Sequence, residues 1–161
     1  MITNDKQAWK KLAVRRDRLH EPLVDKLCTS KSGNSPLFRF NKDLMVFAAM
    51  VGFSKKKRKK LGNDSISIIL ETYASDQKDA FIYLLALITK KNGICLKDEN
   101  LPSSITIFED YCDVGLDEIQ LWFDENPGDH GGVETLAEKI FEQVIANESK
   151  FNPVDNPDDL E

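Results

Sequence analysis

Acidic residues that could bind a magnesium ion together are spread over residues 64–110. Carboxylate oxygens are the ligands that magnesium prefers, and a metal-dependent nuclease uses bound metal to activate water and hold a phosphate. The candidates are Asp64, Glu71, Glu109 and Asp110. A usual nuclease pattern places an acidic residue and a lysine two positions apart on one strand, and Asp76, Lys78 and Asp79 approach it only at a predicted helix start. A metal-dependent nuclease is therefore less well supported than the two binding hypotheses described below, DNA binding and protein docking.

Residues for nucleophilic or zinc chemistry are sparse. The two histidines, His20 and His130, have no second histidine or cysteine within one helical turn, so a zinc site lacks paired ligands. The sequence has no Walker loop, no dinucleotide-binding glycine pattern and no HExxH motif. The glycine-rich loop at 128–132 follows no strand that would present a phosphate. We therefore expect no catalytic residue, no cofactor and no metal, and lean toward a protein that is not an enzyme.

The cysteines and the hydropathy pattern indicate the compartment. Cys28, Cys95 and Cys112 are an odd number, lie far apart and have apolar neighbours, which predicts buried free thiols. No apolar stretch approaches the roughly 20 residues that cross a bilayer, and residues 1–11 lack a secretory apolar core. We expect a cytoplasmic protein with no membrane partner.

Six consecutive cations are the densest charged feature, and they repel one another unless an anion neutralises them. They are Lys55, Lys56, Lys57, Arg58, Lys59 and Lys60. Residues 1–60 hold 16 basic and 5 acidic residues, whereas residues 61–161 hold 6 basic and 22 acidic residues. This asymmetry favours a polyanionic partner, and the phosphates of a DNA backbone fit a dense cationic run. The cations expected to assist are Lys10, Lys11, Arg15, Arg16 and Arg18.

Two other interpretations of the charge pattern stay open. The basic run could be a solvated loop attracted to the acidic second half of the chain, or it could serve as a nuclear-localisation signal in a eukaryotic host. The acidic helices around residues 113–125 could instead dock a basic partner subunit, which would make the protein an adaptor.

The elements that must position these residues are mostly helices. Apolar spacing and capping residues predict helices at 5–18, 21–29, 42–52, 76–90, 103–111, 115–125 and 133–147, with one short extended segment near 65–73. The apolar run 44–51 predicts a central buried helix, in which Ala48 and Ala49 allow a neighbour to approach closely and Gly52 marks the end. We expect a mainly α protein, a compact bundle of about five to six helices. Residues 1–150 should form a single domain, and residues 151–161 a flexible acidic tail.

Three segments resemble a small bacterial family associated with DNA phosphorothioation (Dnd) gene clusters. They are residues 38–53 followed by the basic run, residues 80–87, and residues 107–116, where Phe108, Glu109, Tyr111, Gly115 and Leu116 stand in a similar order. The resemblance implies a bacterial accessory factor of a DNA modification or defence system with no established catalytic activity, so no catalytic residue is carried over. Our leading hypothesis is an accessory protein that binds DNA, or a DNA-bound complex of the system's other proteins, through the basic residues.

Overall fold

The structure, a computed structural model, describes the backbone of residues 5–29 and 35–151 and the side chains of residues 8–29 and 35–148. The chain divides into two compact units, residues 1–121 and residues 122–161. Nearly all of the acidic tail predicted at 151–161 lies outside the described residues.

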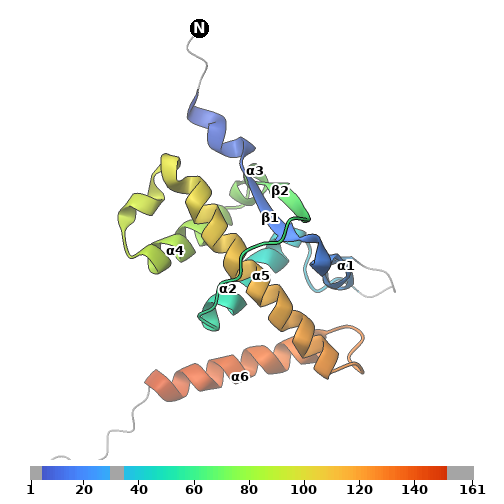
Figure 1. The fold of residues 1–161 in the computed structure, drawn as a ribbon. Coiled ribbons are helices and arrows are strands. Elements are labelled where there is room, and N and C mark those ends of the chain that lie inside the picture. Colours follow the sequence, from blue (N-terminus) through green and yellow to red (C-terminus); the bar gives the residue numbers. More distant parts are fainter. Residues whose placement is uncertain (1–4, 30–34, 152–161) are drawn as a thin grey trace, which may run out of the picture. The chain divides into compact units, whose positions relative to one another are not determined.

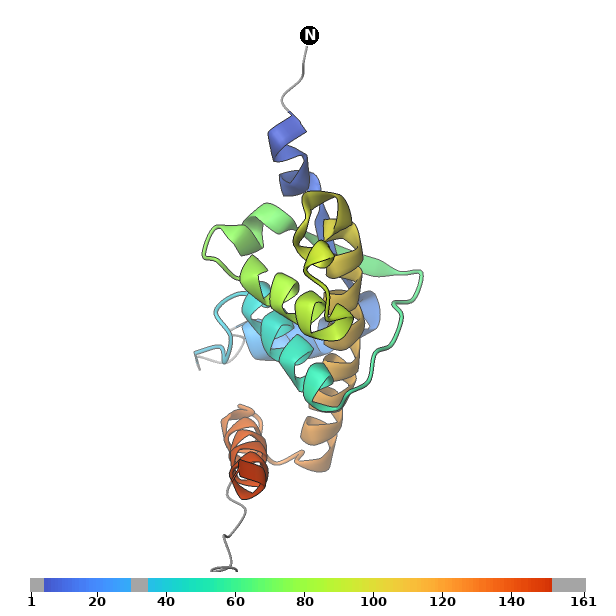
Figure 2. The same cartoon turned by 90° about the vertical axis from the view of Figure 1, so that its left-hand side faces the viewer.

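The first unit contains short 3-10 helices, a pair of strands and most of the α-helices (Figures 1 and 2). In chain order its elements are η1 (Asp5–Lys11), β1 (Ala13–Asp17), η2 (Arg18–His20), α1 (Glu21–Cys28), α2 (Asn41–Ser54), β2 (Ser65–Ile69), α3 (Leu70–Ala74), α4 (Asp79–Lys90), η3 (Gly93–Leu96), η4 (Asp98–Asn100) and α5 (Leu101–Glu125), whose last turn enters the second unit. The second unit also carries α6 (Val133–Phe151). The prediction of a mainly helical protein with one extended segment near 65–73 is confirmed.

The helix predicted at 5–18 is wrong in its second half, where the chain forms β1. This strand pairs antiparallel with β2, from Ala13 opposite Ile69 to Asp17 opposite Ser65. Burial alternates along β1 as a strand requires, because Val14 and Arg16 are buried while Arg15 is exposed. A partner strand 48 to 56 residues away in the sequence thus overrides the local helical pattern, as is common for strands.

Helices α2 and α5 cross so closely that two positions require glycine. A Cβ on Gly115 would lie 1.7 Å from the carbonyl oxygen of Ala48, and one on Gly52 would lie 1.9 Å from that of Tyr111. The close approach predicted at Ala48 is therefore confirmed. The boundaries predicted at the two glycines are wrong, because α2 continues to Ser54 and residues 101–125 form one helix. Both glycines are inside helices because the neighbouring backbone leaves no room for a side chain.

The core of the first unit gathers around α2 and α5. Its fully buried apolar side chains include Leu27, Leu44, Met45, Leu70, Tyr73, Ile82, Leu85, Leu101, Phe108, Leu116 and Ile119. All three cysteines are free, with Cys95 and Cys112 buried and Cys28 half-buried. Burial raises the pKa of the Cys28 thiol to about 11, so this group stays protonated at neutral pH.

No helix in the part of the chain that the structure describes has both the length and the apolar content to cross a lipid bilayer.

Candidate nucleic-acid interface

The basic run follows α2 and lies along α5, antiparallel to it (Figures 1 and 2). Helix α2 ends with the backbone N–H of Lys56 donating to the carbonyl of Phe53 at 2.9 Å, and Lys56 itself has a positive φ of 55°. This left-handed residue turns the chain out of the helix. The N–H of Lys59 then donates to the carbonyl of Asp110 at 3.1 Å, which fixes the run against the middle of α5.

Two of the six residues of the run are anchored through their side chains. Lys55 Nζ lies 2.6 Å from Glu118 Oε1, and Lys59 Nζ lies 2.9 Å from Asp113 Oδ2 and 2.5 Å from Asp117 Oδ2. These partners are acidic residues of α5, within the segment that the sequence offered as a dock for a basic partner. The anchoring therefore favours, for these two lysines, the interpretation of attraction to the chain's own acidic half.

The other four cations of the run are exposed and form no ion pair within the described part of the chain. They are Lys56, Lys57, Arg58 and Lys60. The Arg58 guanidinium lies 6.0 Å from the centroid of the Tyr111 ring, at the limit of a cation–π contact. The run thus combines two fixed points with four charges that face solvent.

A buried carboxylate, Asp113, joins the run to the first part of the chain. Its side chain is fully buried, and its Oδ1 lies 3.0 Å from His20 Nε2. Burial acts to raise the pKa of Asp113, but the hydrogen bonds from His20 and Lys59 outweigh it and lower that pKa below its usual value of 3.8. Asp113 therefore remains ionised at neutral pH and holds Lys59 in place.

Arg15 on β1 continues the charged surface. Its backbone N–H donates to Glu109 Oε1 at 2.7 Å, and its Nη2 donates to Glu109 Oε2 at 3.0 Å. The Glu109 side chain is only 1% exposed, and burial raises its pKa although the Arg15 hydrogen bonds act in the opposite direction. Nearby, Arg18 Nε donates to Asp64 Oδ1 at 2.9 Å. Both guanidinium groups remain about half exposed, so each keeps a solvent-facing side.

The other predicted cations lie apart from this surface. Arg16 is 3% exposed, and its Nη2 lies 2.6 Å from Glu21 Oε2. Lys10 pairs with Glu71 of α3 at 3.1 Å, and Lys11 is exposed on η1. The structure therefore gathers the six residues of the run with Arg15 and Arg18, and it places Arg16, Lys10 and Lys11 elsewhere.

Three of the four carboxylates considered for magnesium pair with cations of the chain, and burial raises the pKa of the fourth, Asp110. Asp64, Glu71 and Glu109 pair with Arg18, Lys10 and Arg15 respectively. The partial nuclease pattern is likewise used in pairing: Asp76 Oδ2 lies 2.9 Å from Lys42 Nζ, and Lys78 pairs with Asp43. Among the described residues no group of three or more His, Cys, Asp or Glu side chains is arranged to hold a metal ion.

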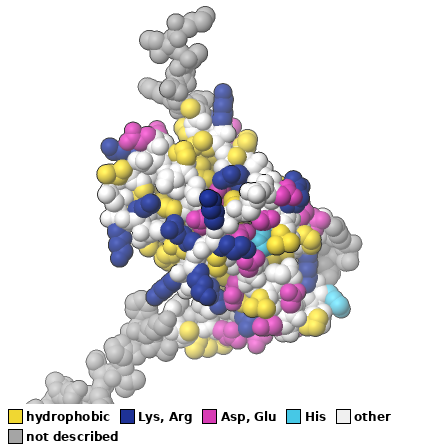
Figure 3. Space-filling model, in the orientation of Figure 1, with side chains coloured by type: hydrophobic (Ala, Val, Ile, Leu, Met, Phe, Trp, Pro, Cys, Tyr) yellow, Lys and Arg dark blue, Asp and Glu magenta, His cyan; other side chains and the backbone are white. Residues whose placement is uncertain are grey.

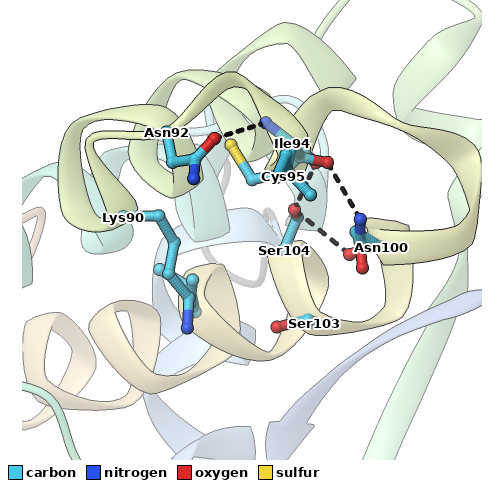
Figure 4. A pocket seen from close by; sticks show the side chains of 8 residues that line it. Lys90, Asn92, Ile94, Cys95, Asn100, Ser103 and Ser104 are labelled. Carbon is cyan, nitrogen blue, oxygen red and sulfur yellow. Dashed lines mark hydrogen bonds between the residues drawn. The ribbon is translucent and has the colours of Figure 1, made fainter.

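A cavity of about 280 Å³ lies where α4 and η3 meet the start of α5 (Figure 4). It is lined by Lys90, Asn92, Ile94, Cys95, Asn100, Ser103, Ser104 and Ile107. The Ser104 hydroxyl donates to the Cys95 carbonyl at 3.0 Å, and the Asn92 side chain accepts from the Ile94 N–H at 3.0 Å. Several of its polar side chains therefore form hydrogen bonds with neighbouring backbone groups, and none is arranged as a nucleophile beside a base.

The surface over α5 is mixed in charge. On the face shown in Figure 3, Lys and Arg side chains gather over the middle and the left of the view, and Asp and Glu side chains lie beside them, mainly to the right and below. The residues that sequence reasoning missed are the acidic partners of the run, Asp113, Asp117 and Glu118, together with His20. The signal available in the sequence was that Asp113 and Asp117 are four residues apart, which places them on one face of a helix, where both contact Lys59.

A family model described as DNA sulphur modification system-associated protein 4 matches residues 13–151. The chain belongs to this family. The match confirms the resemblance to Dnd-associated proteins and includes the basic run, α5 and α6. Searches among curated proteins and among solved structures found no significant match.

Proposed function

We propose that the chain is a non-catalytic, cytoplasmic accessory protein of a bacterial DNA phosphorothioation system and that it binds the DNA backbone, or a DNA-bound complex, through its basic run. The family supports an association with DNA sulphur modification. The observation that carries the proposal is that Lys55 and Lys59 fix the run on α5 while Lys56, Lys57 and Lys60 point their charges at solvent without an ion pair to a described residue.

The anchored geometry favours phosphate binding in two ways. An ordered segment loses less conformational entropy on binding than a free loop does. Arg15 pairs with Glu109, the residue before Asp110, whose carbonyl accepts from the Lys59 N–H. Arg18 pairs with Asp64, four residues after the run, and both guanidinium groups keep an exposed side. Contacts of this type position a protein on the backbone and carry no sequence information, so any sequence preference would come from partner proteins.

The proposal is tested by titrating fluorescent duplex DNA with the intact chain and with a variant carrying Lys56→Gln, Lys57→Gln and Lys60→Gln. A matched control carries Lys90→Gln, Lys91→Gln and Lys97→Gln, which removes the same charge from exposed lysines near α4 and η3. We expect the first variant to lose about tenfold or more in affinity at low salt and the control to lose much less. Equal losses would show a general charge effect, and no binding by the folded chain would reject the proposal.

The adaptor hypothesis keeps support in a modified form. Asp113, Asp117 and Glu118 are already paired with the run, so residues 113–118 offer little free negative charge to a partner. Helix α6, in contrast, carries exposed acidic and apolar side chains. A salt-sensitive complex with a basic protein in the absence of DNA would favour the adaptor role.

A further inference from the structure

Helix α6 exposes an apolar stripe along its length. Val133, Ile140, Phe141, Val144 and Ile145 recur at helical spacing, and each is between 46% and 64% exposed. From residue 137 to residue 148 every side chain except that of Lys139 is exposed. Nineteen residues span about 28 Å at 1.5 Å per residue, which is long enough to seat a partner helix of several turns.

Three glutamates accompany the stripe and are called the glutamate group. On a helical projection Glu134 and Glu148 fall within the stripe, near its two ends, and Glu138 falls at its edge beside Ile145. None of these three carboxylates forms an ion pair with a residue that the structure describes, whereas Lys139 Nζ lies 3.3 Å from Glu142 Oε2. The glutamate group is therefore available to a cationic partner, and its charge repels phosphates.

An exposed apolar stripe of this kind indicates a binding surface. Most of the stability of a helix in a protein comes from packing of its apolar face, and contiguous exposed apolar side chains usually mark an interaction site. The charge pattern discriminates between occupants. A second copy packed antiparallel on the stripe would bring the two glutamate groups together. A parallel copy would leave them without cations, because Lys139, the one lysine among the described α6 side chains, projects from the opposite face and pairs with Glu142.

We propose that α6 binds a cationic amphipathic segment of a partner protein, with Ile140, Phe141 and Val144 receiving its apolar face and Glu138 and Glu148 pairing with its lysines or arginines. This site lies on other residues than the DNA contact, so either proposal can fail without the other. In this arrangement two helices pack together. The apolar side chains of the stripe contribute most of the binding free energy, and the glutamate group favours a partner with basic residues.

The test uses a fluorescent 18-residue peptide of leucine and lysine with helical amphipathic spacing, titrated with the full chain and followed by anisotropy. A scrambled peptide of the same composition and a peptide with glutamate in place of lysine serve as probes of shape and charge. The stripe variant carries Ile140→Gln, Phe141→Gln and Val144→Gln. Its matched control carries Leu84→Gln, Leu87→Gln and Ile88→Gln, three apolar side chains that are similarly exposed on α4.

We expect the intact chain to bind the lysine peptide, the stripe variant to bind it about tenfold or more weakly, and the α4 control to bind it nearly as the intact chain does. A Glu138→Gln, Glu148→Gln pair should weaken binding about threefold and flatten its salt dependence, whereas Asp98→Asn with Glu99→Gln should not. Circular dichroism confirms that each variant remains helical. The proposal is overturned if the intact chain ignores the peptide, if scrambled or acidic peptides bind equally well, or if the stripe instead mediates self-association that light scattering detects.

Discussion

The acidic residues of α5 and those of α6 differ in whether they are paired with cations of the chain. On α5, Glu109, Asp113 and Glu118 are paired with Arg15, Lys59 and Lys55. On α6, Glu134, Glu138 and Glu148 pair with no described residue, and the apolar side chains beside them are exposed. Charge on α5 therefore holds the fold together, while charge on α6 remains available to a partner.

The number of charged residues in a segment therefore does not show whether they stabilise the fold through ion pairs or remain available to a partner. If this contrast is correct, substitutions around α5 change the free energy of unfolding, and equivalent substitutions in the second unit leave it almost unchanged. Of the four predictions that follow, two compare one position in each region, one gives the pH dependence of a substitution on α5, and one compares two lysines of the basic run.

The largest effect is expected at the crossing of α2 and α5. Gly115→Ala would place a Cβ 1.7 Å from the Ala48 carbonyl oxygen, so the helices must separate. We expect a loss of about 3 kcal/mol or more in the free energy of unfolding, measured by urea denaturation. Gly128→Ala in the second unit meets no atom within 4 Å and should change it by less than about 0.5 kcal/mol. Similar losses at both positions would contradict the close crossing.

Removal of a buried carboxylate gives the next effect. Glu109→Ala leaves the Arg15 backbone N–H and guanidinium without their acceptor, and we expect a loss of about 1–3 kcal/mol, limited because Arg15 is half exposed. Glu138→Ala on α6 should cost less than about 0.5 kcal/mol. If chemical denaturation gave equal losses of stability for Glu109→Ala and Glu138→Ala, the proposed difference between α5 and α6 would be contradicted.

Asp113 predicts a pH dependence with a definite sign. Its pKa is lower in the folded chain than the ordinary 3.8, so its ionised form stabilises the fold above about pH 4, and this stabilisation is lost as the pH falls through the lower value. Asp113→Asn should therefore cost about 1–2 kcal/mol at pH 7. The difference between the two proteins should shrink below pH 4 in urea titrations, and a difference that grows there would contradict the assignment.

The smallest effect separates two lysines of one run. Lys59→Gln removes the pairs with Asp113 and Asp117 and should cost about 1 kcal/mol or less, since Lys59 is about half exposed. Lys57→Gln removes no pair with a described residue and should leave stability unchanged while weakening DNA binding. Thermal melts measure the stability of both variants, and DNA titrations measure their affinity. If the two variants lost the same stability and the same affinity, Lys59 and Lys57 would not have the different roles proposed.

Helical elements with a long apolar pattern were predictable, and contacts between distant segments were not. The apolar run 44–51 correctly indicates the buried helix α2. Strand β1 was missed because its partner strand is 48 to 56 residues away in the sequence. The helix break predicted before Gly115 was wrong because the sequence does not distinguish a glycine that permits a close helix crossing from one that ends a helix.

The candidate site was predictable in its residue types but not in its pairing. Six adjacent cations indicate an anionic partner, yet sequence alone does not show that two of them are neutralised by acids about 55–65 residues later. Arg16 illustrates the same limit, since it follows the exposed Arg15 in the sequence and is buried against Glu21. Neighbours on a strand point to opposite faces, and strand pairing was not foreseen there.

The salt dependence of duplex DNA binding tests the central claim most directly. Each phosphate that a cation neutralises contributes about −0.9 to the slope of log affinity against log salt, so four available cations predict a slope of about −3 to −4 and six would give about −5. We expect the shallower slope for the intact chain and its near-disappearance when Lys56, Lys57, Arg58 and Lys60 are all changed to Gln. No binding by the folded chain at low salt, or a slope that survives these substitutions, would contradict the account.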